Sequence, residues 1–137
     1  MQYNVAIALN NEEDRQCVQT IADTMSFSFH TFLIAPETSK ISERLNSGPV
    51  DLLILDLADK EIEHFAVRLR ATRPQLWMVL LKGEQTDPLA FSTDRRSILL
   101  QKPISTMRML HALHTAAAGL TQDGPAQPSP SQDPAES

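Results

Sequence analysis

A chain of 137 residues, 42% of them apolar, is long enough for one compact domain with a hydrophobic core. The net charge of −5 and the scattered basic residues argue against nonspecific nucleic-acid binding, which needs clustered Lys and Arg. A single cysteine, Cys17, excludes an internal disulfide and a cysteine-based zinc site, and it favours a reducing, cytoplasmic location. No apolar stretch approaches the roughly 20 residues of a membrane span, and no signal-peptide pattern opens the chain.

The predicted elements alternate between strands and helices from the N-terminus onward. An apolar run at residues 5–9 predicts the first strand, and Asn11 after it is a suitable helix N-cap. Apolar residues then recur at helical spacing as far as residue 25. Residues 29–35 predict the second strand, and a short helix follows with Ile41 and Leu45 on its inner face.

The rest of the chain continues this alternation. Three further strands are predicted at residues 52–57, 76–81 and 98–100. A helix with one apolar stripe separates the first two of these strands and stops before Pro74. A weaker helix is expected at residues 87–93. The last helix is expected at residues 105–118, with Gly119 as its C′ residue.

Five successive strand–helix units predict an α/β domain, a doubly wound parallel sheet of five strands with helices on both faces. In such sheets, ligands bind at the carboxyl ends of the strands, so the residues that follow each strand are the candidate site.

The composition of the chain changes near Gly119. Residues 1–119 are expected to form the domain, whereas residues 120–137 are rich in Pro, Gln and Ser and carry no apolar anchor. Such a segment cannot bury enough surface to offset its ordering entropy, so we expect a disordered linker or tail. A linker would lead to a further domain, and a plain unstructured tail is the alternative.

Two residue pairs at strand ends carry a resemblance to a known family. Asp56 ends the apolar run DLLILD, and Lys102-Pro103 follows the fifth strand in LLQKPIS. This combination, over residues 1–119, resembles the receiver domains of response regulators. The resemblance implies a flavodoxin-like sheet with strand order 2-1-3-4-5 and five helices. It also implies that Asp56 stands at the phosphoacceptor position, and that the Lys102-Pro103 peptide bond is cis.

The sequence departs from the family pattern around Asp56. Leu9 and Asn10 stand where the family has its metal-binding acids, Lys82 stands at the position of the sensing Thr or Ser, and Leu99 stands at the switch aromatic. The resemblance therefore implies a vestigial phosphoacceptor pocket without a metal or a cofactor. Its residues are Asp56, Lys82, Lys102, Pro103, Leu9 and Asn10, with Leu99 at the switch position. We expect the Lys82 and Lys102 ammonium groups together to pair with the Asp56 carboxylate.

The last helix is apolar around nearly its whole circumference, which indicates that something covers its outer face. We expect its core stripe to comprise Thr106, Leu110, Leu113 and Ala117. The remaining face then predicts self-association as a homodimer through Met107, Met109, Ala112 and His114. The alternative is that the alanines are simply good helix formers.

These features favour a degenerate receiver without enzymatic activity, which acts as a phosphorylation-independent dimerisation or docking module. Its partner would be an attached output domain, with a slight preference for a cyclic-di-GMP regulator of the GGDEF or EAL type, or a separate protein. We expect it to bind neither nucleic acid nor a membrane. The alternative is a two-component receiver that accepts a phosphoryl group on Asp56. A nucleotide-binding enzyme is disfavoured, because NNEED after the first strand is not a glycine-rich phosphate loop.

Overall fold

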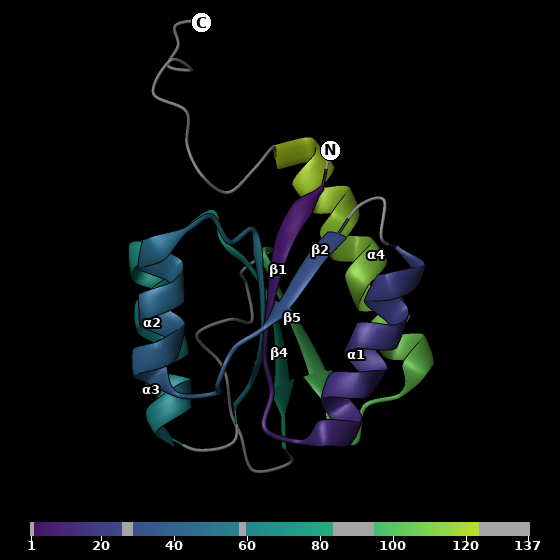
Figure 1. The fold of residues 1–137 in the computed structure, drawn as a ribbon, viewed down its shortest axis with the longest axis horizontal. Helices are drawn as coiled ribbons and strands as arrows, with labels where there is room; N and C mark the ends of the chain where they lie inside the picture. Colours follow the sequence, from purple (N-terminus) through teal and green to yellow (C-terminus); the bar gives the residue numbers. More distant parts are fainter. Residues whose placement is uncertain (1, 26–28, 58–59, 84–94, 124–137) are drawn as a thin grey trace, which may run out of the picture.

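The computed structural model describes residues 2–25, 29–57, 60–83 and 95–123. Five strands form one sheet: β1 (Tyr3–Ala8), β2 (Phe29–Leu33), β3 (Leu52–Asp56), β4 (Trp77–Lys82) and β5 (Ser97–Gln101). All neighbouring strands are parallel, and their order is β2-β1-β3-β4-β5 (Figure 1). The predicted fold class and strand order are thus confirmed.

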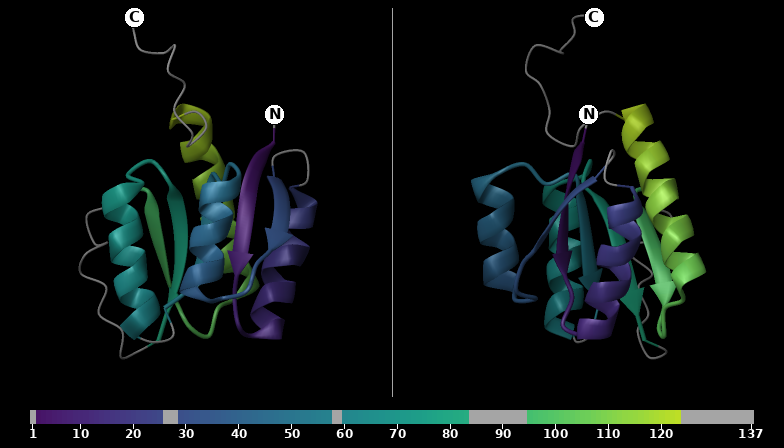
Figure 2. Two further views of the ribbon diagram at one scale, coloured as in Figure 1. Left: turned by 60° about the vertical axis from the view of Figure 1, so that its left-hand side comes forward. Right: turned by 45° about the vertical axis from the view of Figure 1, so that its right-hand side comes forward.

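Helices cover both faces of the sheet. They are α1 (Glu12–Thr24), α2 (Thr38–Ser47), α3 (Lys60–Thr72) and α4 (Thr106–Asp123). Figures 1 and 2 show α1 and α4 on one side of the sheet and α2 and α3 on the other. We call these sides the α1/α4 face and the α2/α3 face. The weak helix predicted at residues 87–93 lies outside the described residues.

The core divides into two clusters because successive strand residues point to opposite faces. On β3, Leu52 and Ile54 pack toward the α1/α4 face, whereas Leu53 and Leu55 pack toward the α2/α3 face. The central strands are buried on both sides, as their continuous apolar runs predict. The edge strand β5 is only partly buried.

The predicted start of α1 is confirmed. The Asn11 side-chain oxygen accepts a hydrogen bond from the Asp14 backbone N–H at 3.0 Å, which satisfies one of the free donors of the first turn.

The predicted end of the last helix is wrong. Helix α4 runs through Gly119 to Asp123, and Leu120 is fully buried. Gly119 lies against the indole of Trp77, so a Cβ atom at this position would overlap the ring carbons Cζ2 and Cη2. The glycine permits close packing of helix on sheet and does not terminate the helix. Helix α4 therefore extends past the predicted boundary at residue 119.

The orientation of the last helix also differs from the prediction. Met109 and Ala112, predicted at a surface, are buried in the core of the α1/α4 face. The inward stripe comprises Met109, Ala112, Leu113, Ala116 and Leu120. Of the predicted stripe only Leu113 is fully buried, since Thr106 is exposed and Leu110 and Ala117 are half-buried. Met107, with 72% of its surface exposed, and His114 do face solvent.

Of the helices in the described ranges, none combines the length and apolarity that crossing a bilayer demands.

Candidate functional site

Asp56 and Lys102 form an ion pair at the carboxyl edge of the sheet. Asp56 is the last residue of β3, and its side chain is 9% exposed. The Lys102 ammonium Nζ donates to Asp56 Oδ1 at 2.9 Å and to Oδ2 at 3.2 Å. One cation thus engages both carboxylate oxygens, and the low exposure limits screening by water.

The backbone after β5 positions this lysine. The Lys102 N–H donates to the Lys82 carbonyl oxygen at 2.8 Å, which continues the β4–β5 pairing past the end of β5. The Lys102-Pro103 peptide bond is cis, as the resemblance implies, and Pro103 is exposed. Lys102 is therefore held by the sheet at the point where its side chain can reach Asp56.

A second carboxylate, that of Asp14, lies near this pair. Partial burial and the negative charge of Asp56 raise the pKa of the Asp14 carboxyl above its ordinary value of 3.8, while the positive charge of Lys102 opposes the increase. We call Asp56, Lys102 and Asp14 the Asp56 pocket.

Asp14 is not among the site residues predicted from the sequence, although its position in the helix is a signal for it. Asp14 precedes Val18 by four residues and Ile21 by seven, so it lies on the inward stripe of α1 at the N-terminal end of the helix.

Leu9 and Asn10 do not join the Asp56 pocket. The Leu9 side chain is fully buried in the core of the α1/α4 face, following Val5 and Ile7 at alternate positions. Asn10 is exposed at the surface. The prediction that these two residues belong to the pocket is therefore wrong, since the Leu9 side chain is part of the core and Asn10 faces solvent.

The residues present do not fit the divalent cation that the resemblance implies. Mg²⁺ binds several oxygen ligands in near-octahedral geometry. The Asp56 pocket offers two carboxylates, and both oxygens of Asp56 already accept hydrogen bonds from Lys102. Among the described residues, there is no group of three or more His, Cys, Asp or Glu side chains that could hold a metal ion.

The expected contact between Lys82 and Asp56 is wrong. The Lys82 ammonium donates instead to Gln101 Oε1 at 2.8 Å. Asp56 pairs in register with Leu81, so Lys82 is one residue further along β4 and belongs to the opposite face of the sheet. Leu99, at the predicted switch position, is partly buried against the core of the α2/α3 face.

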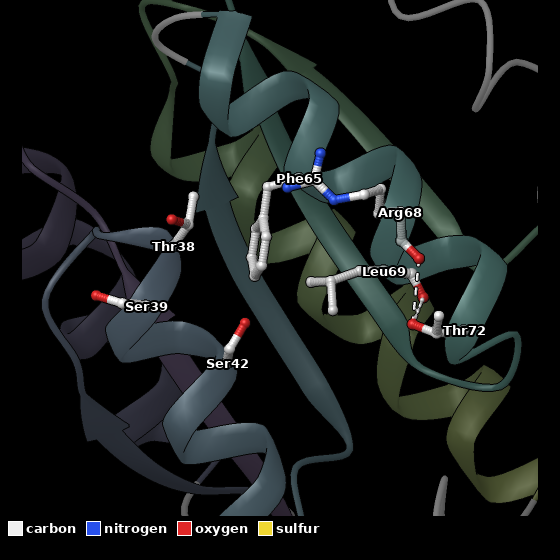
Figure 3. A pocket seen from close by; sticks show the side chains of 7 residues that line it. All are labelled: Thr38, Ser39, Ser42, Phe65, Arg68, Leu69 and Thr72. Atoms are coloured by element: carbon white, nitrogen blue, oxygen red, sulfur yellow. Dashed lines mark hydrogen bonds between the residues drawn. The ribbon is translucent and has the colours of Figure 1, made fainter.

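A surface groove of about 350 Å³ lies between α2 and α3, away from the Asp56 pocket. Figure 3 shows the Phe65 ring and the Leu69 side chain pointing from α3 toward α2, where the Ser42 hydroxyl faces them. The remaining lining residues are Thr38, Ser39, Arg68 and Thr72. None of these described lining residues carries a carboxylate. This groove could not be predicted from the sequence, because its lining comes from two helices and follows no motif.

The chain is similar in structure to response-regulator proteins. No family model matches the chain, and no curated protein matches it. The response regulatory domain of protein mrkE from Klebsiella pneumoniae superposes with a TM-score of 0.73 at 14% identity, over 87% of this chain and 98% of that chain. The receiver domain of an HD domain-containing protein from Pseudomonas fluorescens Pf-5 gives 0.71 at 19% identity, over 89% and 99%. NtrX from Brucella abortus gives 0.68 at 17% identity, over 90% of this chain but 28% of that one.

The fold and the site therefore define a class. The chain has the fold of the response-regulator receiver domains, and Asp56 and Lys102 form an ion pair at the carboxyl edge of its sheet. At these levels of identity, the likeness concerns the fold.

Proposed function

We propose that this chain is a receiver-type signalling module that works without phosphoryl turnover and transmits information by binding a partner. The observation that carries the proposal is the state of Leu9 and Asn10. Leu9 is buried in the core and Asn10 is exposed, so neither supplies an acidic oxygen beside Asp56. Without a cation to neutralise the incoming phosphoryl group, Asp56 is a poor nucleophile toward a phosphoryl donor.

The charge arrangement in the Asp56 pocket supports the same proposal. Lys102 neutralises Asp56 directly, with its ammonium on both carboxylate oxygens. The carboxylate is therefore already paired inside the protein. An ion pair that is mostly shielded from water acts as a fixed structural element, because separating it leaves a buried charge.

We propose an attached output domain as the partner, in a cytoplasmic protein without enzymatic activity in this domain. Two structural neighbours support a multidomain arrangement: one receiver belongs to an HD domain-containing protein, and the NtrX chain is several times longer than the matched part. A cyclic-di-GMP regulator remains our preferred context, on the ground that a Pro/Gln/Ser-rich segment at residues 120–137 suits a tether.

Homodimerisation through α4 is proposed only on its exposed residues. Met107 and His114 remain available, whereas Met109 and Ala112 are core residues and are no longer part of the proposal. Sedimentation equilibrium tests this directly. A concentration-dependent dimer that Met107→Glu weakens would support it, and a monomer at high micromolar concentration would contradict it.

The second candidate function is a phosphorylatable receiver with Asp56 as the acceptor. The Asp56–Lys102 pair favours this candidate, because it matches the resemblance at the acceptor side of the site. It would require metal ligation by Asp56 together with Asp14 or water.

A titration with Mg²⁺ and beryllofluoride separates the two candidates. The proposed function predicts no saturable change in the backbone amide resonances of residues 55–57 and 102, in the wild type or in Asp56→Asn. Saturable changes in the wild type that vanish in Asp56→Asn would establish the phosphorylatable receiver.

A further inference from the structure

Lys82 and Gln101 form a second polar pair at the carboxyl edge of the sheet. They end the neighbouring strands β4 and β5, and their Cα atoms are partners in the register of the two strands. Lys82 follows Leu80, and Gln101 follows Leu99, by two residues, and both of these leucines pack on the α2/α3 face. Asp56 and Lys102 follow Ile54 and Leu100 of the α1/α4 face in the same way.

The two polar pairs therefore belong to opposite faces of the sheet. The Lys82–Gln101 pair is separate from the Asp56 pocket.

The Lys82–Gln101 pair has more hydrogen-bond donors than acceptors. The Lys82 ammonium carries three N–H groups, and with the described residues it makes one hydrogen bond, to Gln101 Oε1 at 2.8 Å. The Gln101 amide nitrogen Nε2 is buried, and no acceptor among the described residues lies within hydrogen-bond distance of it. A buried donor without a partner destabilises the folded state, so this nitrogen requires an acceptor.

The missing acceptor should also carry negative charge. No carboxylate of the described residues forms an ion pair with Lys82, whereas Lys102 has Asp56. The carboxyl edge of a parallel sheet is the side on which such folds bind ligands. An oxygen-bearing anion would accept hydrogen bonds from both Lys82 and Gln101 and would neutralise the lysine.

We propose that Lys82 and Gln101 form a binding site for a small oxyanion, a phosphate or a carboxylate group, on the α2/α3 face of the sheet edge. The anion would accept from the buried Gln101 amide and from the Lys82 ammonium. The site does not require Asp56, so it operates in either of the candidate functions.

Nuclear magnetic resonance of the Gln101 side-chain amide tests the proposal. The protein is titrated with inorganic phosphate and separately with acetate, while sodium chloride keeps the ionic strength constant. We expect a saturable shift of the Gln101 amide signals with at least one of these anions. Lys82→Met should weaken the response about tenfold or more, which corresponds to the loss of one charge-assisted hydrogen bond.

Two variants serve as controls. Lys40→Met removes an exposed lysine on α2 and should leave the response unchanged. Asp56→Asn should also retain it, which separates this site from the Asp56 pocket. No saturable shift with either anion would overturn the proposal and would leave water as the acceptor. An equal response in Lys82→Met, or its loss in Asp56→Asn, would overturn it as well.

The variant Gln101→Glu gives an independent readout through thermal stability. It removes the unpartnered amide and places a carboxylate beside Lys82, so the melting temperature should rise in phosphate-free buffer. Phosphate should then stabilise the wild type, by binding to the native state, and not this variant. A lower melting temperature of Gln101→Glu without phosphate, or an equal stabilisation of both proteins by phosphate, would contradict the site.

Discussion

At the scale of single residues, the pairing of Asp56 with Lys102 has a measurable energetic consequence. Asp56 is 9% exposed and Lys102 is 31% exposed at its side chain. Lys102→Met keeps most of the aliphatic stem but leaves a largely buried carboxylate without its cation. We expect a loss of roughly 2 kcal/mol in the free energy of unfolding, less than the ~3–5 kcal/mol of a fully buried pair. Urea denaturation measures this loss.

Matched variants separate pairing from general effects of losing a lysine. Lys40→Met removes an exposed lysine whose ion pair with Glu43 spans 4.0 Å, and it should change stability by less than about 0.5 kcal/mol. Adding Asp56→Asn to Lys102→Met should recover part of the loss, because the unpaired charge is then gone. Equal effects of the two lysine substitutions would show that the pair contributes nothing.

The raised pKa of Asp14 predicts that the stability of the protein depends on pH. Burial and the Asp56 charge raise the pKa of the Asp14 carboxyl in the folded state, so the folded protein holds this proton more tightly than the unfolded chain does. The contribution of Asp14 is then most favourable below its unfolded pKa near 3.8, and it is lost as the pH rises through the raised folded value.

The variant Asp14→Asn tests this sign. Its stability relative to wild type should improve as the pH rises from below 3.8 toward neutral. Carboxyl-carbon titration by nuclear magnetic resonance should also show that Asp56→Asn lowers the Asp14 pKa. A stability difference that stays constant with pH, or falls as the pH rises, would contradict the proposed burial.

Single residues were the least predictable part of the chain. Asp56 and Lys102 could be placed from sequence because each follows an apolar strand, and the structure brings them together. Lys82 could not be placed relative to Asp56 from the sequence. The register of β3 and β4 decides whether the two side chains lie on the same face of the sheet, and the sequence does not give that register. A shift of one residue would have reversed the result.

At the scale of elements, the contact of Gly119 with Trp77 determines how closely α4 approaches β4. Gly119→Ala improves the helix propensity by about 1 kcal/mol. However, the added methyl group would overlap the indole ring, and we expect a net loss of about 1–3 kcal/mol from this overpacking. In a Trp77→Leu background the ring is gone, so the same substitution should become neutral or stabilising. Thermal denaturation of the wild type, the two single variants and the double variant measures the coupling between positions 119 and 77. Additive effects of the two substitutions would contradict the contact.

Hydrogen bonds from Arg70 hold the start of the edge strand β5. Its guanidinium donates to the Arg96 carbonyl at 3.3 Å and to Ser97 Oγ at 3.1 Å, next to the start of β5. It also donates to the carbonyls of Arg73 and Pro74, beyond the end of α3. Arg70→Met should cost about 1–3 kcal/mol and should raise amide exchange first in β5.

Arg68 supplies the matched control for Arg70. It lies on the same helix, is exposed, and its guanidinium makes no hydrogen bond or ion pair with the described residues. Arg68→Met should therefore leave stability and the exchange of β5 nearly unchanged. Equal exchange profiles for the two variants would mean that Arg70 does not anchor the strand.

The elements show how far local sequence patterns reach. Each predicted strand corresponds to an observed strand with ends shifted by no more than two residues, because apolar runs mark the buried parallel strands. The end of α4 was not predictable, because Gly119 is a usual helix stop and its reason here is a contact with Trp77, 42 positions away in the numbering. The inward face of α4 was ambiguous because apolar residues surround the helix.

At the scale of the whole molecule, the sequence predicts the sheet and its strand order because five strand–helix units leave few topologies. The carboxyl edge of the sheet then carries two polar pairs, one on each face. The Asp56–Lys102 pair is internally neutralised, whereas the Lys82–Gln101 pair has donors that no described residue accepts from. We propose that the Asp56 pocket is a fixed structural element and that binding elsewhere on the domain carries the signal.

The most direct test of this account is incubation with acetyl phosphate and Mg²⁺, followed by intact-protein mass spectrometry under conditions that preserve acyl phosphates. The wild type should show no phosphoryl adduct above the level of Asp56→Asn. A phosphoryl adduct in the wild type that is absent from Asp56→Asn would contradict the central claim and would establish Asp56 as a phosphoacceptor.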